Sequence, residues 1–207
     1  QRHSKYSIST FVENAASSFS NRTFIAKYPN GDVFAYGRST WAMLNIATRE
    51  PQNILEVNDG VMGNYVAGEI LQVPIEKPNR VNFKSSPILF RTIDTYYNDV
   101  DFNAHINSCR YIEHVLDLFS LEGHKKYIVK RLDVVYVAEA HCGDKLRFYT
   151  SEPTYYQSLE NLELGVENSL QKEEEAILLD NKFVEYRVRI CKVENGVAEE
   201  KECVRMK

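Results

Sequence analysis

The chain has 207 residues, of which 43% are apolar and 26% are charged, and its formal net charge at pH 7 is -4. This composition is typical of a folded globular protein and excludes a disordered or collagen-like chain, while the length allows one large or two small domains. The negative charge argues against a nucleic-acid-binding protein, and no apolar run approaches the ~20 residues that a membrane span requires.

The cysteines are widely spaced, so they form neither a CxxC pair nor a dense disulfide framework. The first residues lack the basic and then apolar pattern of a signal peptide. We therefore predict reduced thiols and a cytoplasmic protein. We also predict no cofactor and no metal site, because the histidines lack partners at metal-ligand spacing. The cysteines are Cys109, Cys142, Cys191 and Cys203.

Three segments near the start of the chain have the composition of β-strands: residues 5–12, 19–28 and 33–44. Each is rich in β-branched or aromatic residues, which favour the extended conformation. Asn30 and Gly31 lie between the second and third segments, and an Asn-Gly pair favours a tight turn because both residues accept positive φ. The last two segments are therefore predicted to form a hairpin.

Residues 74–84 contain two prolines among charged side chains, a composition typical of a linker. The pattern of strands around an Asn-Gly pair then returns near the C-terminal end, at residues 195–196. This weak repeat indicates two copies of one architecture. We predict a first domain at residues 1–73 and a second domain at residues 85–207.

The second copy is predicted to begin with a strand at residues 88–97 and to continue with one long amphipathic helix. Its apolar stripe starts at Ile106 and recurs every three or four residues for about four turns. Asn103 is the expected N-cap of this helix, and residues 122–123, Glu-Gly, are expected to end it.

Four strands are predicted after the helix, at residues 127–139, 146–150, 183–190 and 197–206. The first copy holds only three strands, so we infer that it lacks an opening strand, a helix and one further strand. The expected fold is α+β, with an antiparallel sheet wrapped round a long helix and an incomplete first domain, in an N-terminally truncated fragment of a longer protein. Residues 153–180 fit neither copy and are predicted to form an acidic insertion.

The densest polar stretch lies at the entry to the predicted helix, where Asp101, Asn103 and His105 occupy alternate positions. Alternate side chains of extended backbone project toward one side. The N–H groups at a helix N-terminus stabilise an oxyanion, which forms when a carbonyl is attacked. A carboxylate and an imidazole near such donors favour a hydrolytic site. Alternatively, Asp101 and Asn103 only cap the helix and His105 lies in its first turn.

Residues 101–107, Asp-Phe-Asn-Ala-His-Ile-Asn, followed by Tyr111, resemble the Asp-x-Asn-x-His-x-Asn signature of acyl-acyl-carrier-protein thioesterases. Residues 136–139, Tyr-Val-Ala-Glu, match the strand that bears the catalytic glutamate of that family. Residues 39–45 and 74–78 resemble the end of its first domain and its linker. The resemblance favours bacterial members of the Bacteroides type over plant plastid enzymes. Because this family has two hot-dog domains in one chain, it implies tandem hot-dog domains.

The resemblance implies a catalytic set in the second domain. Asp101 or Glu139 would activate water or attack the thioester carbonyl. Asn103 and His105 would orient the carboxylate and the substrate. The backbone N–H groups of Ala104 and His105 would stabilise the oxyanion. The implied catalytic residues are Asp101, Asn103, His105 and Glu139.

Some plant members of this family carry a cysteine directly after the glutamate, once interpreted as a papain-like nucleophile. Ala140 occupies that position in this chain, and Cys142 lies three residues past Glu139. We therefore do not predict a mechanism based on a Cys-His pair, and we interpret Cys142 as structural.

An acyl carrier protein is acidic, so the resemblance also implies a basic docking surface. A homodimer is a further expectation, because an incomplete first sheet would leave apolar surface and unpaired strand edges. The docking candidates, which follow the predicted helix, are Lys125, Lys126, Lys130 and Arg131.

The leading hypothesis is hydrolysis of the acyl-acyl-carrier-protein thioester, which releases a free fatty acid and ends chain elongation. An acyl-CoA thioesterase of the 4-hydroxybenzoyl-CoA type is the first alternative, since it shares an aspartate before the same helix. A hot-dog module that binds acyl chains without turnover is the second.

Overall fold

The computed structural model describes residues 5–66, 73–76, 80–83, 85–156, 183–194, 197 and 199–207. The chain divides into two compact units, residues 1–79 and 80–207, and their boundary lies inside the stretch predicted to be a linker. Most of the predicted acidic insertion and the predicted turn at residues 195–196 lie outside the described residues. In the described parts of the chain, no helix is both long enough and apolar enough to cross a membrane.

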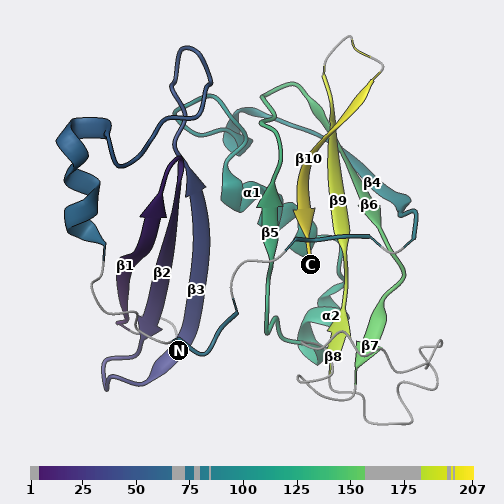
Figure 1. The fold of residues 1–207 in the computed structure, drawn as a ribbon. Helices are drawn as coiled ribbons and strands as arrows, with labels where there is room; N and C mark the ends of the chain where they lie inside the picture. The colour runs from purple at the N-terminus through teal and green to yellow at the C-terminus, as the bar shows by residue number, and fades with distance from the viewer. Residues whose placement is uncertain are drawn as a thin grey trace. The chain divides into compact units, whose positions relative to one another are not determined.

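The first unit contains a three-stranded antiparallel sheet in the order β1-β2-β3 (Figure 1). The three strands predicted for this region are confirmed, with small shifts at their ends. The predicted hairpin is confirmed as well, since Gly31 has a φ of 92° and its N–H donates to the Tyr28 carbonyl at 2.9 Å. A 3-10 helix that the sequence pattern did not predict follows the sheet. These elements are β1 (Ser7–Ala16), β2 (Phe19–Lys27), β3 (Val33–Ala42) and η1 (Val57–Tyr65).

The interior of the first unit is small and partly polar over its described residues. Val12 and Ile54 are buried apolar side chains, and Thr23 is fully buried. The Thr23 hydroxyl donates to the Glu13 carboxylate, which also forms an ion pair of 2.7 Å with Arg38. Charged groups therefore occupy space that apolar side chains would fill in a larger core.

The second unit contains a five-stranded sheet in the order β4-β6-β9-β10-β5, in which all neighbours are antiparallel. A separate two-stranded sheet pairs β7 with β8. The elements of the larger sheet are β4 (Ile88–Asp94), β5 (Val134–Tyr136), β6 (Lys145–Thr150), β9 (Val188–Val193) and β10 (Glu200–Met206). The other elements are η2 (Tyr97–Asp99), α1 (Ser108–Leu116), α2 (Leu121–Lys126), β7 (Thr154–Tyr156) and β8 (Phe183–Glu185).

The prediction of one long helix is wrong, because two short helices occupy this region. Asn107, not Asn103, caps α1: its side-chain oxygen accepts the Cys109 N–H at 2.9 Å. Ala104 has a φ of 61°, a left-handed conformation that an α-helix cannot include, so the helix starts after it. Ser120 caps α2 through a 3.1 Å bond from the Gly123 N–H, so the expected stop at residues 122–123 lies inside a helix.

Four of the five strands predicted for the second unit are shorter than expected. β4 ends at Asp94 rather than at residue 97, β10 begins at Glu200 rather than at residue 197, and the other two differ more. Only residues 134–136 of the segment 127–139 form a strand, and its pairing with β10 ends where Asp133 and Lys207 exchange backbone hydrogen bonds of 2.9 Å. The segment 183–190 divides in two because β8 pairs with β7 whereas β9 pairs with β6 and β10. The alternation of apolar residues in both segments indicated extended backbone, but it did not show which residues would pair with a neighbouring strand.

The core of the second unit lies between α1 and the five-stranded sheet. Tyr111 and Val115 of α1 pack against side chains such as Phe148 and Ile190, which are fully buried. Because α1 covers one face of the sheet, the position of its N-terminal end relative to the strands is fixed by apolar packing. The buried cluster consists of Ile106, Tyr111, Val115, Ala140, Leu146, Phe148, Val188, Ile190, Cys203, Val204 and Met206.

Candidate active site

A tight hairpin directly before α1 carries the polar motif. The Asp101 N–H donates to the His105 carbonyl at 2.9 Å, and the Ala104 N–H donates to the Asp101 carbonyl at 3.0 Å. The side chain of Phe102 at the tip is 97% exposed. Asp101 Oδ1 accepts the Asn103 N–H at 2.9 Å, so this carboxylate stabilises the turn that carries it.

The sequence expectation for the oxyanion donors needs a correction. Ala104 and His105 lie before α1 rather than at its N-terminus, since the helix begins at Ser108. The Ala104 N–H already donates to the Asp101 carbonyl. Of the two predicted oxyanion donors, the His105 N–H is therefore the remaining candidate.

His105 and Glu139 lie together although 34 residues separate them in sequence. His105 Nε2 is 3.5 Å from Glu139 Oε2, and the two side chains are 32% and 43% exposed. The backbone explains this approach, because the Ile106 N–H donates to the Ala140 carbonyl at 2.8 Å. Ile106 and Ala140 are both buried, so the apolar core holds the two segments side by side while their polar neighbours face water.

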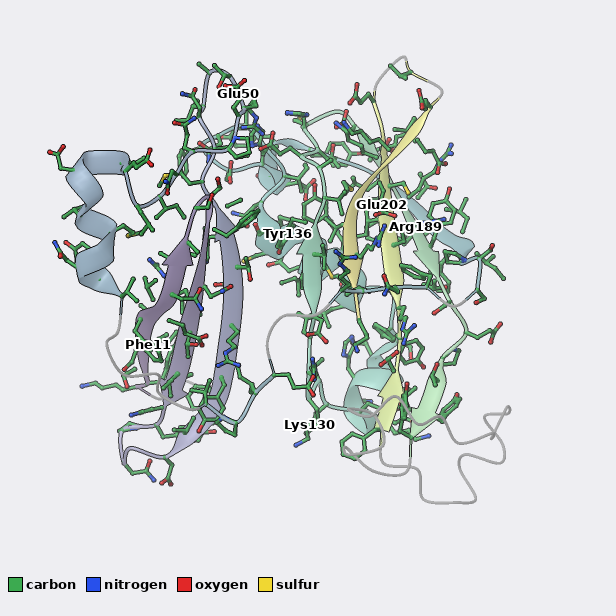
Figure 2. The ribbon with its side chains drawn as sticks, in the orientation of Figure 1. Phe11, Glu50, Lys130, Tyr136, Arg189 and Glu202 are labelled. Atoms are coloured by element: carbon green, nitrogen blue, oxygen red, sulfur yellow. The ribbon has the colours of Figure 1, made fainter. Side chains whose placement is uncertain are left out.

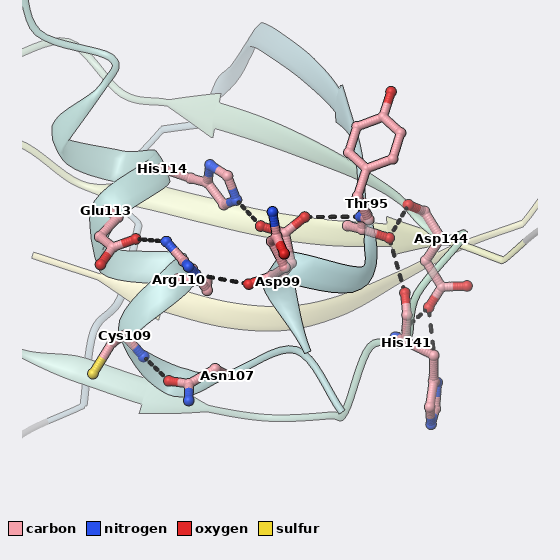
Figure 3. Close-up of polar contacts among 11 residues, drawn as sticks. Thr95, Asp99, Asn107, Cys109, Arg110, Glu113, His114, His141 and Asp144 are labelled. Atoms are coloured by element: carbon pink, nitrogen blue, oxygen red, sulfur yellow. Dashed lines mark hydrogen bonds and ion pairs between the residues drawn. The ribbon is translucent and has the colours of Figure 1, made fainter. Parts of the chain in front are cut away.

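His141 is a site residue that the sequence analysis missed. Its ring lies edge-on to the His105 ring, with a centroid separation of 5.1 Å and an interplanar angle of 82°. The Asp144 carboxylate accepts the His141 N–H at 2.8 Å and lies 3.8 Å from His141 Nδ1 (Figure 3). The available signal was alternation, since His141 follows Glu139 by two positions, but the sequence did not show that Asp144 would turn back toward it.

A second missed contact links the start of the motif to α1. Asp99 is buried, and its carboxylate lies 3.2 Å from His114 Nε2 and accepts the Tyr96 N–H at 2.8 Å (Figure 3). The Asp99 carbonyl accepts the Asn107 N–H at 2.8 Å. Arg110 Nε donates to the Asn98 carbonyl at 3.1 Å. The segment that leads into the motif hairpin is thereby bound to the N-cap of α1 and to two residues of that helix.

The buried thiol and phenol beneath this site are poor candidates for chemistry. Burial raises the pKa of the Cys203 thiol to about 12 and raises the pKa of the Tyr111 hydroxyl above its ordinary value. Cys142 is exposed on the turn after Ala140, which is fully buried. Within the described part of the chain, no group of three or more potential metal ligands is gathered.

The basic docking candidates lie on α2 and on the segment that leads into β5, where Figure 2 labels Lys130. Lys125 forms an exposed ion pair of 2.7 Å with Glu122. Lys126 Nζ lies 5.1 Å from the centroid of the Tyr127 ring. Arg131 pairs with Asp133 at 2.9 Å, so part of the positive charge of this surface is neutralised locally.

Known proteins resemble the chain over most of its length. Residues 86–188 match the acyl-ACP thioesterase C-terminal domain family. An acyl-ACP thioesterase from Bacteroides thetaiotaomicron has a solved structure that is similar with a TM-score of 0.71 and 32% sequence identity, covering 98% of this chain and 67% of that one. A 12:0-ACP thioesterase from Umbellularia californica has the same fold, with a TM-score of 0.66 and 15% identity over 97% of this chain and 65% of its own.

Among curated proteins, a chloroplastic acyl-acyl-carrier-protein hydrolase from Cuphea viscosissima is 24% identical over 176 residues. That alignment includes 81% of this chain but only 43% of the hydrolase. The chain therefore spans less than half the length of this relative.

Proposed function

The chain belongs to the acyl-acyl-carrier-protein thioesterase family and has a hot-dog-like thioesterase fold of antiparallel sheets with few helices, and from this premise we propose that it hydrolyses acyl-acyl-carrier-protein. The products would be a free fatty acid and the carrier-protein thiol. The observation that carries the proposal is the 3.5 Å approach of His105 to Glu139 beside the motif hairpin.

In the proposed reaction, Glu139 removes a proton from water while the water oxygen attacks the thioester carbonyl. Glu139 suits this role because its side chain is 43% exposed and lies against an imidazole. The C–S bond then breaks, and the sulfur leaves as a thiol because it receives the proton that Glu139 took from water, which returns Glu139 to its carboxylate form. Hydrolysis of this kind needs no cofactor.

The hairpin residues have supporting roles in this mechanism. Asp101 shapes the turn through its bond to the Asn103 N–H, and the exposed Asn103 side chain contacts the substrate. His105 orients Glu139, and its N–H stabilises the oxyanion.

Three further features belong to the proposal. The two units are two copies of the hot-dog fold in tandem, the protein acts in the cytoplasm, and its partner is an acidic acyl carrier protein that docks on Lys125, Lys126, Lys130 and Arg131.

A homodimer is also proposed, because large apolar side chains such as Trp41, 57% exposed, lie on the first unit. Sedimentation at increasing concentration tests the dimer, and a monomer throughout would exclude it.

Thiol release from matched acyl-acyl-carrier-protein and acyl-CoA substrates tests the activity. We expect faster turnover of the carrier-protein thioester, and a loss of turnover of about 100-fold or more in Glu139→Gln. Glu50→Gln is the matched control, because Glu50 is an exposed carboxylate in the other unit (Figure 2).

Each other outcome of this assay has a defined meaning. A preference for CoA would replace the proposal with the acyl-CoA thioesterase alternative. Binding of acyl chains without hydrolysis would replace it with the binding-module alternative. Unchanged kinetics in Asp101→Ala and Glu139→Ala would show that the assigned residues are wrong.

A further inference from the structure

We propose that His141 is a positioning residue for His105, a role that rests on the proposed thioester hydrolysis. The ring of His141 lies edge-on to the His105 imidazole, at 5.1 Å between centroids and 82° between planes. An edge-on arrangement places the positive edge of one ring against the negative face of the other, which favours a single relative orientation.

The contact is supported by backbone pairing rather than by side chains alone. His105 and His141 lie opposite each other in an antiparallel bridge, and the adjacent Ile106 N–H donates to the Ala140 carbonyl at 2.8 Å. Directly opposite side chains of an antiparallel pair lie within contact distance on the same face. The two imidazoles are therefore brought together by the same pairing that brings His105 to Glu139.

His141 is in turn held by groups that are themselves fixed. Asp144 is buried, accepts the His141 N–H at 2.8 Å and lies 3.8 Å from Nδ1. Thr95 is also buried, and its hydroxyl lies 2.9 Å from the His141 carbonyl oxygen and 2.8 Å from the Asp144 carbonyl oxygen (Figure 3). Gly143 closes the turn between them with a φ of 92°, a conformation that glycine adopts without strain.

The consequence concerns the His105 rotamer. His105 Nε2 contacts Glu139 only while its ring keeps the orientation in which Nε2 faces that carboxylate at 3.5 Å. The His141 side chain is half exposed, so it contributes little to the core, and its position at the site is not explained by packing stability. His141 restricts the His105 ring to the orientation that keeps the Glu139 contact.

The test compares the kinetics of the full chain carrying His141→Ala and His141→Phe. The alanine variant removes the ring, so kcat is expected to fall about 10- to 100-fold with little change in KM, because the catalytic group is misplaced while the substrate still binds. The phenylalanine variant restores an aromatic edge and is expected to recover most of kcat. His124→Ala is the matched control, since His124 lies on α2, makes an edge-on ring contact with Phe119 and should keep the wild-type kcat when replaced.

A double variant that carries both His105→Ala and His141→Ala shows whether His141 acts by positioning His105 or has an independent role. If His141 acts through His105, then His105→Ala and the double variant should have equal kcat. Losses that multiply, a wild-type kcat in His141→Ala, or a phenylalanine variant as impaired as the alanine variant would each overturn the proposal.

Nuclear magnetic resonance of the histidine rings gives a readout that does not depend on turnover. The His105 ring signals should shift in His141→Ala and remain near their wild-type positions in His141→Phe. If the wild type shows no thioesterase activity, the proposed function fails, and this measurement still decides whether His141 orients His105. Unchanged His105 signals in the alanine variant would overturn the positioning role.

Discussion

The two units of this chain are both built from antiparallel strands, yet they bury very different interiors. In the second unit, α1 covers the five-stranded sheet and eleven described residues form one continuous apolar cluster. In the first unit, large side chains of the three-stranded sheet remain exposed, including Ile8 at 60%, Phe19 at 56% and Trp41 at 57%. A sheet excludes water from its apolar face only where another layer lies on it, so the strands alone do not make a core.

The candidate site lies in the second unit, which is the unit with the larger apolar core. Its residues lie on segments that the core of the second unit holds together, through Ile106, Tyr111 and Ala140. In the first unit, by comparison, a partly buried ion pair links Glu13 of β1 to Arg38 of β3. Precise placement of catalytic side chains requires a rigid packed support, which the second unit provides.

The largest expected difference between the two units is in the free energy of unfolding that is lost when a phenylalanine of each unit is replaced. Phe148→Ala should lower the free energy of unfolding by about 3–5 kcal/mol, because Phe148 is fully buried in β6 and its loss leaves a cavity. Phe19→Ala should cost about 1 kcal/mol or less, because Phe19 is already largely exposed. Urea titrations followed by circular dichroism measure both values, and equal losses would contradict the difference in packing.

A smaller loss is expected from His114→Leu. This change removes the partner of the buried Asp99 carboxylate and should destabilise the second unit by about 2–3 kcal/mol. His114→Gln, whose amide can still donate to Asp99, is the matched control and should retain most of the stability. Thermal denaturation of the two variants checks the prediction, which a leucine variant as stable as the glutamine variant would refute.

The reactivity of the cysteines measures the exposure of side chains in the second unit alone, since all four cysteines lie within it. A thiol reagent such as Ellman's reagent should modify the exposed Cys109 and Cys142 rapidly in the folded protein. Cys191 and Cys203 should react only on unfolding, because both are buried and burial raises the pKa of each thiol, that of Cys203 to about 12. Rapid modification of all four thiols at neutral pH would show that this core opens readily.

The smallest effect concerns a polar cluster on the second unit's sheet. Hydrogen bonds from the Tyr149 hydroxyl and from Arg147 hold the pKa of Glu200 below its ordinary value of 4.5. A lowered carboxyl pKa stabilises the folded state above pH 4.5, and this stabilisation is lost as the pH falls through the folded-state pKa. Glu200→Gln should therefore reduce the acid sensitivity of unfolding slightly, and an unchanged pH profile would contradict this contribution.

Much of the fold could be predicted from local sequence. The content of β-branched and aromatic residues identified the three strands of the first unit, and the Asn30-Gly31 pair identified the hairpin of the last two, because these signals depend on neighbouring residues. The apolar stripe also identified a helix near residue 108, but its start was misplaced because the left-handed Ala104 and the Asn107 cap compete with Asn103.

The candidate site was accessible from sequence only in part. Spacing and resemblance singled out Asp101, Asn103, His105 and Glu139, and the sequence by itself determined that three of these polar groups precede a helix. It did not predict the hairpin that carries those three residues. It did not reveal His141, whose role depends on a contact with a ring 36 residues away.

Only the tertiary structure decided which strands found partners, where α1 began and which side chains met at its N-terminal end. The physical reason is that pairing register and helix packing depend on contacts between distant segments, such as the Ile106–Ala140 hydrogen bond. Local patterns set what each segment can form, and the buried core selects which of those possibilities is kept.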